Sequence, residues 1–527
     1  MHNDSVVTLP VIQQYKLVVD PQTTGQERQP RDASFWLVFL GIGFATMITA
    51  LEWSAVSNAL PTIVQDLHGS SFIWVGSAYT LAGTAFIPLS GGLSQIFGRR
   101  IVVLSSLAIM ALGSALCGSA QSMTHLIAGR TVQGLGGGGI SATTAIIISD
   151  LVPLSERGLY NGLIGIAWAM AGSMGPIVGG ALAQNGQWRW LFYLNLPICG
   201  VAAIIMTFCL RVQTPPGTLR EKLRRVDWLG TFLVIAATAA CVIGLTWSGI
   251  QYSWTSAPVL APLIIGIVGM VAFITYECIF PEYPLVPSAL LSTITGISGY
   301  MQTFLLPIVM IGIIYYIPVY LQACKGASPI GAGVDMLSFS LIVAPVGLLG
   351  GTGLLITLDA DTPLGHTIGF IAPCALGCGL LAFSTYFPVL APLHVSQNGL
   401  AIAFFMFLRN FAMVWGVTIG GTVLQNELPK HLPAAFAAQF PEGTVIAYAT
   451  IPTISSLPEP LRTEVRQAFA ASLKVVWEVL LGVGGLGLAS SLAMKALPLH
   501  TAVDDKWALQ QKEKGSVDSL STLGTAV

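Results

Sequence analysis

Charged side chains are scarce in this chain of 527 residues. Aspartate, glutamate, lysine and arginine make up 9% of it, against roughly 25% in ordinary globular proteins. Hydrophobic residues make up 54% and the mean hydropathy is +0.75, which excludes a soluble enzyme and a disordered scaffold. With 23 basic and 24 acidic residues, the chain has no basic field that could hold nucleic acid. The composition predicts a protein whose solvent is the lipid bilayer.

Sequence motifs of other function classes are also missing. No Gly-Lys dipeptide occurs, so there is no Walker A loop, and ATP is not expected to drive the protein. The run from Gly134 to Gly139 fits GxGxxG, but it lies in an apolar segment and follows no strand, which argues against a dinucleotide cofactor. The eight cysteines form no CxxC pair and have no histidine at ligand spacing. We therefore expect no catalytic residue, no metal and no cofactor.

Thirteen segments are long and apolar enough to cross a membrane as helices, which takes about 20 residues each. They lie near 34–60, 71–91, 101–120, 125–149, 159–183, 191–210, 228–250, 257–279, 294–322, 334–358, 366–390, 399–424 and 473–497. The first 33 residues are polar and contain no pattern of a cleavable signal peptide, so the first span is expected to act as the insertion signal. Basic residues gather in alternate loops, which predicts a cytoplasmic N-terminus.

The order of these segments predicts an all-α membrane protein of two pseudo-symmetric helical bundles. We expect a cytoplasmic tail over 1–33, a six-helix bundle over 34–210, a basic cytoplasmic linker over 211–227, a two-helix insert over 228–280, a second bundle over 281–497 and a C-terminal tail over 498–527. The spacing GxxxGG occurs twice, 241 residues apart, at Gly175, Gly179 and Gly180 and at Gly416, Gly420 and Gly421. Glycines one helical turn apart let helices approach closely in lipid, so both sets are predicted to pack against a neighbouring helix. Repeated halves are typical of secondary transporters.

Charged residues inside the spans are candidates for function, because a charge at membrane depth is costly. Glu52 in the first span and Arg130 in the fourth lie at similar depths and could meet across the bundle. Gln133, one turn after Arg130, shares its helix face. Such a pair could load or release a proton after small changes of geometry. A static buried ion pair is the alternative.

Three further charges lie inside the predicted spans. Arg409, followed by Asn410, precedes the second glycine set and is a weaker functional candidate. Glu277 and Glu478 lie in the eighth and last spans, and we expect both at the membrane rim, where their carboxylates can reach water.

Four short motifs of the first bundle point to a known family. They are Leu51-Glu52-x-Ser54 before Ala59-Leu60-Pro61, the loop Gly92 to Arg100, Arg130-x-x-Gln133-Gly134, and Gly172-x-x-Gly175-Pro176-x-x-Gly179-Gly180. Over nearly its whole length the chain resembles the major facilitator superfamily, in particular the fungal 14-span branch of drug:proton antiporters. The resemblance implies proton coupling through Glu52, Arg130 and Gln133, although Glu52 replaces the usual Asp and Ser54 the usual Thr.

The same resemblance implies a cytoplasmic gate and an export direction. The gate would comprise Gly92, Gly98, Arg99 and Arg100, together with Asp150 and Arg157 of the next cytoplasmic turn. Gln95 stands where an Asp is usual, which puts the charge relay of the family in question. The glycine motif of the fifth span is typical of antiporters and favours export. Possible cavity residues are aromatic, amide and basic side chains of the inner spans, namely Trp168, Gln302, Tyr315, Tyr316, Arg409 and Asn410.

The second bundle departs from the family pattern, because it is one helix short. Ser34 to Gly175 spans 141 residues and Thr293 to Gly416 spans 123, a deficit of 18. We predict a missing helix near 353–360 and irregular or re-entrant backbone within 350–392. A gene model that lacks a segment and a truly incomplete bundle are the two explanations. Thirteen crossings from a cytoplasmic N-terminus would place the C-terminal tail outside, against the family pattern.

These observations predict a secondary transporter that exports small amphipathic organic molecules, such as drugs, toxins or secondary metabolites, in exchange for protons. We expect it to work as a monomer in the lipid bilayer, driven by a proton gradient, most naturally in the plasma membrane, with a vacuolar or other internal membrane as the alternative. Two other functions stay open. One is proton-coupled uptake, and the other is a non-transporting or defective paralogue with a shortened second half.

Overall fold

The computed structural model describes residues 31–67, 73–212, 215–248, 252–327, 355, 357–367, 369–371, 373, 384–437, 451–495 and 497–498. Within these ranges the secondary structure is helical, without β-strands. The predicted tails lie almost wholly outside the described residues.

The helices of the first half and the insert follow the predicted spans closely. They are α1 (Ala33–Leu67), α2 (Ile73–Phe97), α3 (Arg99–Gly118), α4 (Met123–Leu151), α5 (Arg157–Gln184), α6 (Trp190–Tyr193), α7 (Asn195–Cys209), α8 (Leu219–Arg224), α9 (Trp228–Trp247) and α10 (Ala257–Ile279). The second half contains α11 (Ile294–Lys325), α16 (Tyr386–Leu390), α17 (Asn398–His431), α18 (Ala434–Ala437) and α20 (Leu461–Ser491), with 3₁₀ turns at Ser288–Leu291, Val395–Gln397 and Ile451–Ser456.

Among the described residues, nine helical segments are apolar and long enough to cross a membrane. α2 and α4, with 25 and 29 residues, also have spanning length, although glycine and polar residues lower their hydropathy. Eleven of the thirteen predicted spans therefore correspond to helices. The other two, 334–358 and 366–390, fall mainly outside the described residues.

Local sequence sets several helix ends. Ser122 caps α4 by accepting from the His125 N–H at 3.2 Å, and Thr293 caps α11 by accepting from the Gly296 N–H at 3.1 Å. Gly98 adopts a φ of 95° between α2 and α3, and Gly326 a φ of 66° after α11, conformations that favour glycine. The last helix begins at Leu461, twelve residues before the predicted start at residue 473. Its first turns are amphipathic, with Val465 and Phe469 buried, so they extend the helix beyond the continuous apolar residues of the predicted span.

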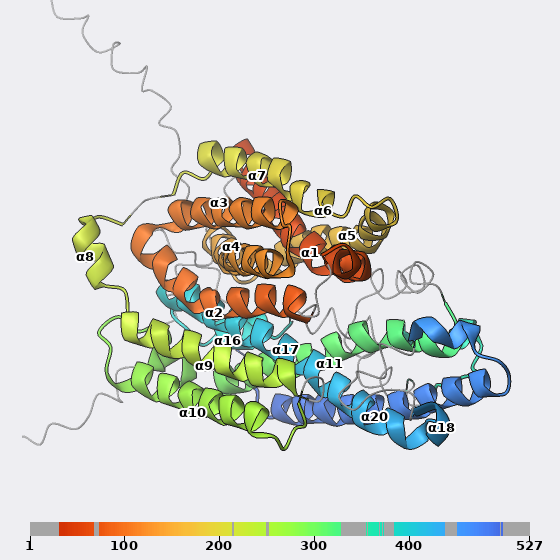
Figure 1. Cartoon of the computed structure of the whole chain (residues 1–527). Helices are drawn as coiled ribbons and strands as arrows, with labels where there is room; N and C mark the ends of the chain where they lie inside the picture. Colours follow the sequence, from red (N-terminus) through yellow and green to blue (C-terminus); the bar gives the residue numbers. More distant parts are fainter. Residues whose placement is uncertain are drawn as a thin grey trace, which may run out of the picture.

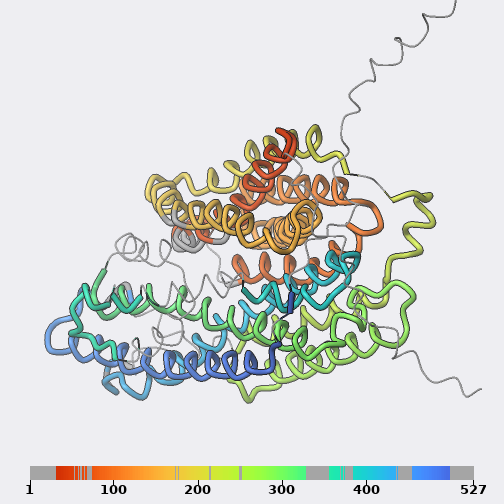
Figure 2. The backbone as a smooth tube through the Cα atoms, turned by 180° about the vertical axis from the view of Figure 1, so that it is seen from behind, coloured from red at the N-terminus to blue at the C-terminus, as the bar shows by residue number. Residues whose placement is uncertain are grey.

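The helices form two groups with the insert beside their junction. Figure 1 shows α1 and α3 to α7 together in the upper part and α11, α17 and α20 below, while Figure 2 gives the same grouping from behind. α5 packs on α1 in the first group, and α17 packs on α11 in the second. α9 and α10 pack on each other, and α9 contacts both α2 and α17. The insert therefore touches both halves through α9.

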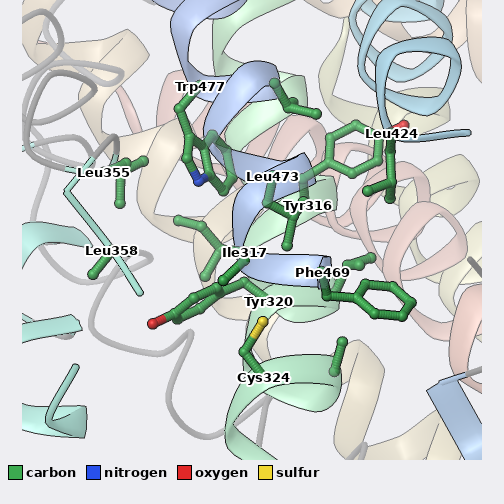
Figure 3. Packing of buried hydrophobic residues seen from close by; sticks show 14 of the residues in the cluster. Tyr316, Ile317, Tyr320, Cys324, Leu355, Leu358, Leu424, Phe469, Leu473 and Trp477 are labelled. Atoms are coloured by element: carbon green, nitrogen blue, oxygen red, sulfur yellow. The ribbon is translucent and has the colours of Figure 1, made fainter. Parts of the chain in front are cut away.

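The core of the second half is a continuous apolar cluster. Side chains of α11, α17 and α20 interdigitate there, including Tyr316, Leu424 and Trp477 (Figure 3). Tyr320 and Cys324 extend the cluster toward the end of α11. Such packing fixes the positions of the three helices relative to one another.

The ends of the described helices bear on the predicted number of crossings. We call the end of the molecule that holds the α2–α3 turn the gate end. The Lys495 N–H donates to Thr295 at 3.2 Å, so the chain after α20 lies at the start of α11, and Arg31 before α1 pairs with Glu156 between α4 and α5. The described residues before α1 and after α20 therefore both lie at the gate end. The number of thirteen crossings stays a prediction, because two of the predicted spans fall mainly outside the described residues.

Described residues on either side of the predicted span 334–358 contact each other. Lys325 Nζ donates to the Asp359 carbonyl at 3.2 Å, so these residues lie together at the end opposite the gate. The rest of that segment, and most of the predicted irregular backbone within 350–392, lies outside the described residues. The missing helix near 353–360 stays a prediction.

Candidate functional site

Glu52 and Arg130 meet in the middle of the first helix group. The Arg130 guanidinium, through its NH1 nitrogen, pairs with Glu52 Oε2. Both residues are 2% exposed. The Arg130 guanidinium also lies over the Tyr79 ring, 4.5 Å from its centre. The predicted contact across the bundle is therefore present, and it is closed off from solvent.

Arg130 has further acceptors besides the carboxylate. Its Nε donates to the Val75 carbonyl at 2.9 Å, and NH1 donates to Gln133 Oε1 at 2.6 Å. Gln133 in turn donates through Nε2 to Ser114 Oγ at 2.9 Å. The guanidinium thus ties α4 to α1 and α2, and Gln133 extends the network to α3. Because neutral acceptors remain, Arg130 keeps hydrogen bonds even when Glu52 carries no charge.

Asn195 is a member of this cluster that the sequence did not single out as a site. Its Nδ2 donates to Glu52 Oε1, and the residue is fully buried at the start of α7. Each oxygen of the Glu52 carboxyl group therefore faces its own donor, one charged and one neutral. An amide at the start of an apolar span is the signal that could have identified Asn195.

The glycine motif of α5 packs against α1 next to this cluster. A Cβ atom added to Gly175 would lie 1.9 Å from Ser54 Oγ, and one added to Gly179 would lie 2.5 Å from the Ala55 carbonyl oxygen. Ile177, between them, is 57% exposed. Gly172 has nothing within 4 Å of such an atom, so it does not take part in the close contact. Gly180 is half-buried, and the Pro176 side chain lies outside the description.

The second glycine set makes the equivalent contact in the other half. A Cβ atom at Gly416 would lie 2.6 Å from the Ile308 carbonyl oxygen, and one at Gly420 would lie 2.1 Å from the Tyr316 ring. A Cβ atom at Gly421 would lie 3.0 Å from the Tyr316 hydroxyl oxygen. α5 on α1 and α17 on α11 are therefore matching helix pairs, joined in both cases where glycine removes the side chain.

The predicted gate residues form a second polar cluster at the gate end. Arg99 Nε donates to Asp150 Oδ2 at 2.8 Å, with 1% and 7% of the two side chains exposed. Arg99 NH1 also donates to the Ser94 carbonyl at 3.0 Å and to Gln95 Oε1 at 3.2 Å. Gln95 therefore accepts from Arg99 through a neutral amide where a carboxylate would have added charge.

The other predicted gate residues hold backbone groups. Arg157 donates to the Val152 carbonyl at 2.8 Å and to the Ser149 carbonyl at 2.6 Å, which fixes the turn after α4. Arg100 donates to the Thr207 carbonyl at 2.6 Å and so joins α3 to α7. These are helix-end contacts in which guanidinium groups complete the hydrogen bonding of terminal carbonyls.

The two helix groups touch at the gate end through α2 and α17. A Cβ atom at Gly91 would lie 2.2 Å from the Ala403 Cβ, and one at Gly399 would lie 2.1 Å from Gln95 Nε2. Gly92, the first residue of the gate loop, lies against Leu285 after the insert, with 2.9 Å between its notional Cβ and Leu285 Cδ2. The gate loop is thus the place where both halves and the insert come together.

Comparison with known proteins identifies the family. The model of the Major Facilitator Superfamily matches residues 42–440. The chain belongs to the Major Facilitator Superfamily. It is 35% identical over 537 residues to a protein named efflux pump FUS6 of Gibberella fujikuroi, with 96% of each chain covered. It is also 35% identical to the MFS-type efflux pump LUC4 of a Fusarium species, with 92% of this chain and 91% of the relative covered. A transporter of the acurin A biosynthesis cluster of Aspergillus aculeatus is 33% identical, with 90% and 92% covered.

Solved structures agree with this membership at the level of the fold. A POT family peptide transporter superposes with a TM-score of 0.54 at 12% identity, covering 88% of this chain and 99% of its own. The human organic anion transporter MFSD10 gives a TM-score of 0.51 at 13% identity, with 86% and 100% covered. The chain is thus a membrane transporter of the major facilitator fold, and not an enzyme.

The predicted cavity residues of this transporter lie in different surroundings. Tyr316 is 1% exposed and donates to the Val417 carbonyl at 2.6 Å, inside the core of the second half. Gln302 is buried, whereas Tyr315, farther along the same helix, is 38% exposed. Trp168, Arg409 and Asn410 are half-buried, and Asn410 donates to the Met406 carbonyl at 2.8 Å. Tyr315 and Tyr316 adjoin each other, with 6.4 Å between their ring centres, and a cavity shared by all six residues stays a prediction.

A third polar contact joins helices at the end opposite the gate. Asp66 Oδ2 accepts from Trp188 Nε1 at 2.9 Å and from Arg189 NH1 at 3.0 Å. This contact connects the end of α1 to the turn before α6. Trp188 and Arg189, between the fifth and sixth spans, therefore have a structural role, because they hold the end of α1 through Asp66.

Proposed function

We propose that this transporter exports small amphipathic organic molecules in exchange for protons, with Glu52 as the proton carrier. The single observation that carries the proposal is the buried Glu52 carboxyl group, held between Arg130 and Asn195. The names of the relatives as efflux pumps support the direction. Their names also support secondary metabolites as the substrate class, since one belongs to a biosynthesis cluster. A plasma-membrane location and a monomeric state are part of the proposal.

The local geometry supports reversible protonation. A proton on Glu52 cancels its attraction for Arg130, which retains the Val75 carbonyl and Gln133 as acceptors. Loss of the proton restores the ion pair, so both states of the carboxyl group leave the guanidinium hydrogen-bonded. If the Arg130 guanidinium had no other acceptors, protonation of Glu52 would leave a buried charge without a partner, and the protonated state would be too unstable to form.

The glycine contact supplies a route from the proton to the conformation of the bundle. Ser54 and Ala55, two and three residues after Glu52 on α1, lie directly against Gly175 and Gly179 of α5. A shift of α1 on protonation should therefore move α5, because only the small Ser54 side chain separates the backbones at Gly175 and the Ala55 backbone itself is the nearest neighbour at Gly179. Alternating access would follow from this movement of one helix pair within the first group.

Proteoliposomes containing a pH-sensitive dye test the proposal. Purified full-length protein is reconstituted, the lumen is acidified, and a panel of amphipathic organic acids, amines and neutral compounds is added outside. An antiporter lets protons leave as a compound enters, so the lumen becomes more alkaline. A symporter would carry protons inward together with the compound, and that result would establish uptake in place of export.

Glu52→Gln separates a coupling role from a structural one. The glutamine keeps the shape of the side chain and can form hydrogen bonds to its neighbours, but it does not titrate. Proton movement should therefore stop, while exchange of labelled compound for unlabelled compound continues. Glu478→Gln is the matched control, since Glu478 also lies within a spanning helix but is exposed. Proton-coupled transport by Glu52→Gln at the rate of the control would show that Glu52 carries no proton.

A further inference from the structure

A second carboxyl pair lies at the gate end of the two inserted helices, away from Glu52. Asp227 is the N-cap residue of α9, and Glu277 lies in the last turn of α10. The two helices run antiparallel, because Gly244 near the end of α9 contacts Leu263 near the start of α10. Glu277 is only 2% exposed, so its carboxyl group does not have the expected access to water.

Each of these carboxyl groups has one oxygen with donors and one without. Asp227 Oδ1 accepts from the Gly230 N–H at 2.9 Å and from the Tyr276 hydroxyl at 3.2 Å. Glu277 Oε2 accepts from the Val286 N–H at 3.1 Å. Asp227 Oδ2 and Glu277 Oε1 are both buried and have no hydrogen-bond partner in the described part of the chain.

The two unpartnered oxygens face the same point beside Gly230. A Cβ atom added to Gly230 would lie 2.2 Å from Asp227 Oδ2 and 2.3 Å from Glu277 Oε1. The sum of these distances, 4.5 Å, is the largest separation the two oxygens can have. Among the described residues, neither carboxyl group forms an ion pair with a basic side chain. Glycine at position 230 leaves the space that the pair occupies.

We propose that Asp227 and Glu277 share one proton between Oδ2 and Oε1 and form a proton-binding clasp distinct from the Glu52 site. Two carboxyl groups that share a buried site do not both ionise readily, since like charges repel and burial disfavours charge. One shared hydrogen also gives both oxygens the bond that each lacks. The pair therefore holds a proton at neutral pH and releases it to solvent at the gate end as the pH rises.

The clasp holds the segment that lies on the gate loop. Glu277 binds the Val286 N–H, and the preceding residue, Leu285, packs on Gly92. Loss of the proton would leave two negative charges in contact and drive the carboxylates apart. The Leu285–Val286 segment would then loosen from Gly92. The gate end of the transporter would thereby respond to the pH of the compartment it faces.

Few other ionisable groups adjoin the pair in the described structure. Tyr276 on α10 contacts Asp227, and Glu282 and Tyr283, both exposed, follow α10. Arg225 lies 6.0 Å from the centre of the Tyr283 ring. Where α9 meets α2 and α17, the described contact is apolar, with Leu81 of α2 and Phe411 of α17 packed against α9. The carboxyl groups are therefore the groups whose titration should control the clasp.

Infrared spectroscopy of the full-length protein tests the shared proton, and the test does not rest on the proposed direction of transport. Wild-type protein in lipid vesicles should show the carbonyl band of a protonated carboxyl group at neutral pH, and part of that band should disappear at alkaline pH. In wild type, the part of the band that disappears should equal one carboxyl group per chain. Glu277→Gln and Asp227→Asn should each lack this part, because the new amide donates the hydrogen bond to the remaining carboxylate in place of the shared proton. Glu282→Gln, an exposed glutamate five residues from Glu277, should keep the band.

Thermal unfolding provides a second readout should one variant fail to fold. A proton held in the folded state and released on unfolding stabilises the protein less as the pH rises. The unfolding midpoint of wild type should therefore fall above neutral pH, with a shallower fall for Glu277→Gln and Asp227→Asn. Identical bands and identical pH profiles in wild type and all three variants would overturn the shared proton. A rise of the midpoint on addition of Na⁺ or Ca²⁺, absent in Glu277→Gln, would show a metal site in its place and overturn it equally.

Discussion

Alanine substitutions along the glycine motif of α5 test the close contact between α1 and α5, through which protonation of Glu52 is proposed to move α5. Gly172, Gly175 and Gly179 lie on one helix and differ in what a methyl group would meet. At Gly172 it meets nothing within 4 Å, at Gly175 it meets the Ser54 hydroxyl at 1.9 Å, and at Gly179 it meets a backbone carbonyl oxygen at 2.5 Å. The three variants therefore add the same methyl group at three sites that differ in how much free space surrounds it.

The expected magnitudes follow from two opposing effects. Replacing glycine by alanine within a helix stabilises it by about 0.5–1 kcal/mol, and this gain is common to the three sites. Overpacking costs about 1–3 kcal/mol where the neighbours cannot move. Gly172→Ala should raise the free energy of unfolding, and Gly179→Ala should lie about 1–3 kcal/mol below it, because a helix backbone must shift. Gly175→Ala should fall between the two, since the Ser54 side chain can rotate.

Thermal unfolding of the full-length protein, followed by intrinsic tryptophan fluorescence, measures this order. Gly172→Ala serves as the matched control, because it carries the same helix-propensity gain without the contact. Transport in proteoliposomes should fall in the same order as the contact tightens, since α1 and α5 must move together. A midpoint for Gly179→Ala equal to that of Gly172→Ala would refute the packing argument and place this face of α5 against lipid.

Three further predictions concern the polar clusters and the second glycine set. Arg130→Lys should lose most proton-coupled transport in proteoliposomes, because an ammonium group lacks the planar fork that reaches both Glu52 and the Val75 carbonyl; near wild-type rates would show that charge alone suffices. Asp150→Asn should lower the free energy of unfolding by about 3–5 kcal/mol, since Arg99 would stay buried without its counter-ion. Asp66→Asn, at the exposed pair with Arg189, should lower it by only about 0–1 kcal/mol. Equal effects of the two variants on the unfolding midpoint would contradict this. Gly420→Ala should lower the midpoint, because its methyl group would lie 2.1 Å from the Tyr316 ring, and an unchanged midpoint would show that the ring moves freely.

Much of the fold could be predicted because the bilayer restricts the choice so strongly. A stretch of about 20 apolar residues has few alternatives to a helix in lipid, so hydropathy alone located eleven of the helices. The same criterion failed where a helix is amphipathic. α20 begins at Leu461 with turns that carry exposed polar residues, before the continuous apolar residues of the span.

The candidate site could be predicted in part, for a related reason. A glutamate and an arginine in the middle of apolar spans stand out against their surroundings, and helix geometry places them at similar depth. Asn195 did not stand out, because an amide at the end of a span is ordinary. Glu277 was misjudged, since its position near the end of α10 suggested access to water, while Asp227 and the chain after α10 cover it.

The sequence by itself determined the membrane environment, the helices and the family, because these follow from composition, apolar runs and short motifs that act locally. Only the tertiary structure decided which polar groups face each other. It placed Asn195 on Glu52 across 143 residues, and Asp227 opposite Glu277 across two antiparallel helices. The physical reason is that a buried polar group must find its partner within about 3 Å, and hydropathy records how deep a residue lies but not the direction in which its side chain points.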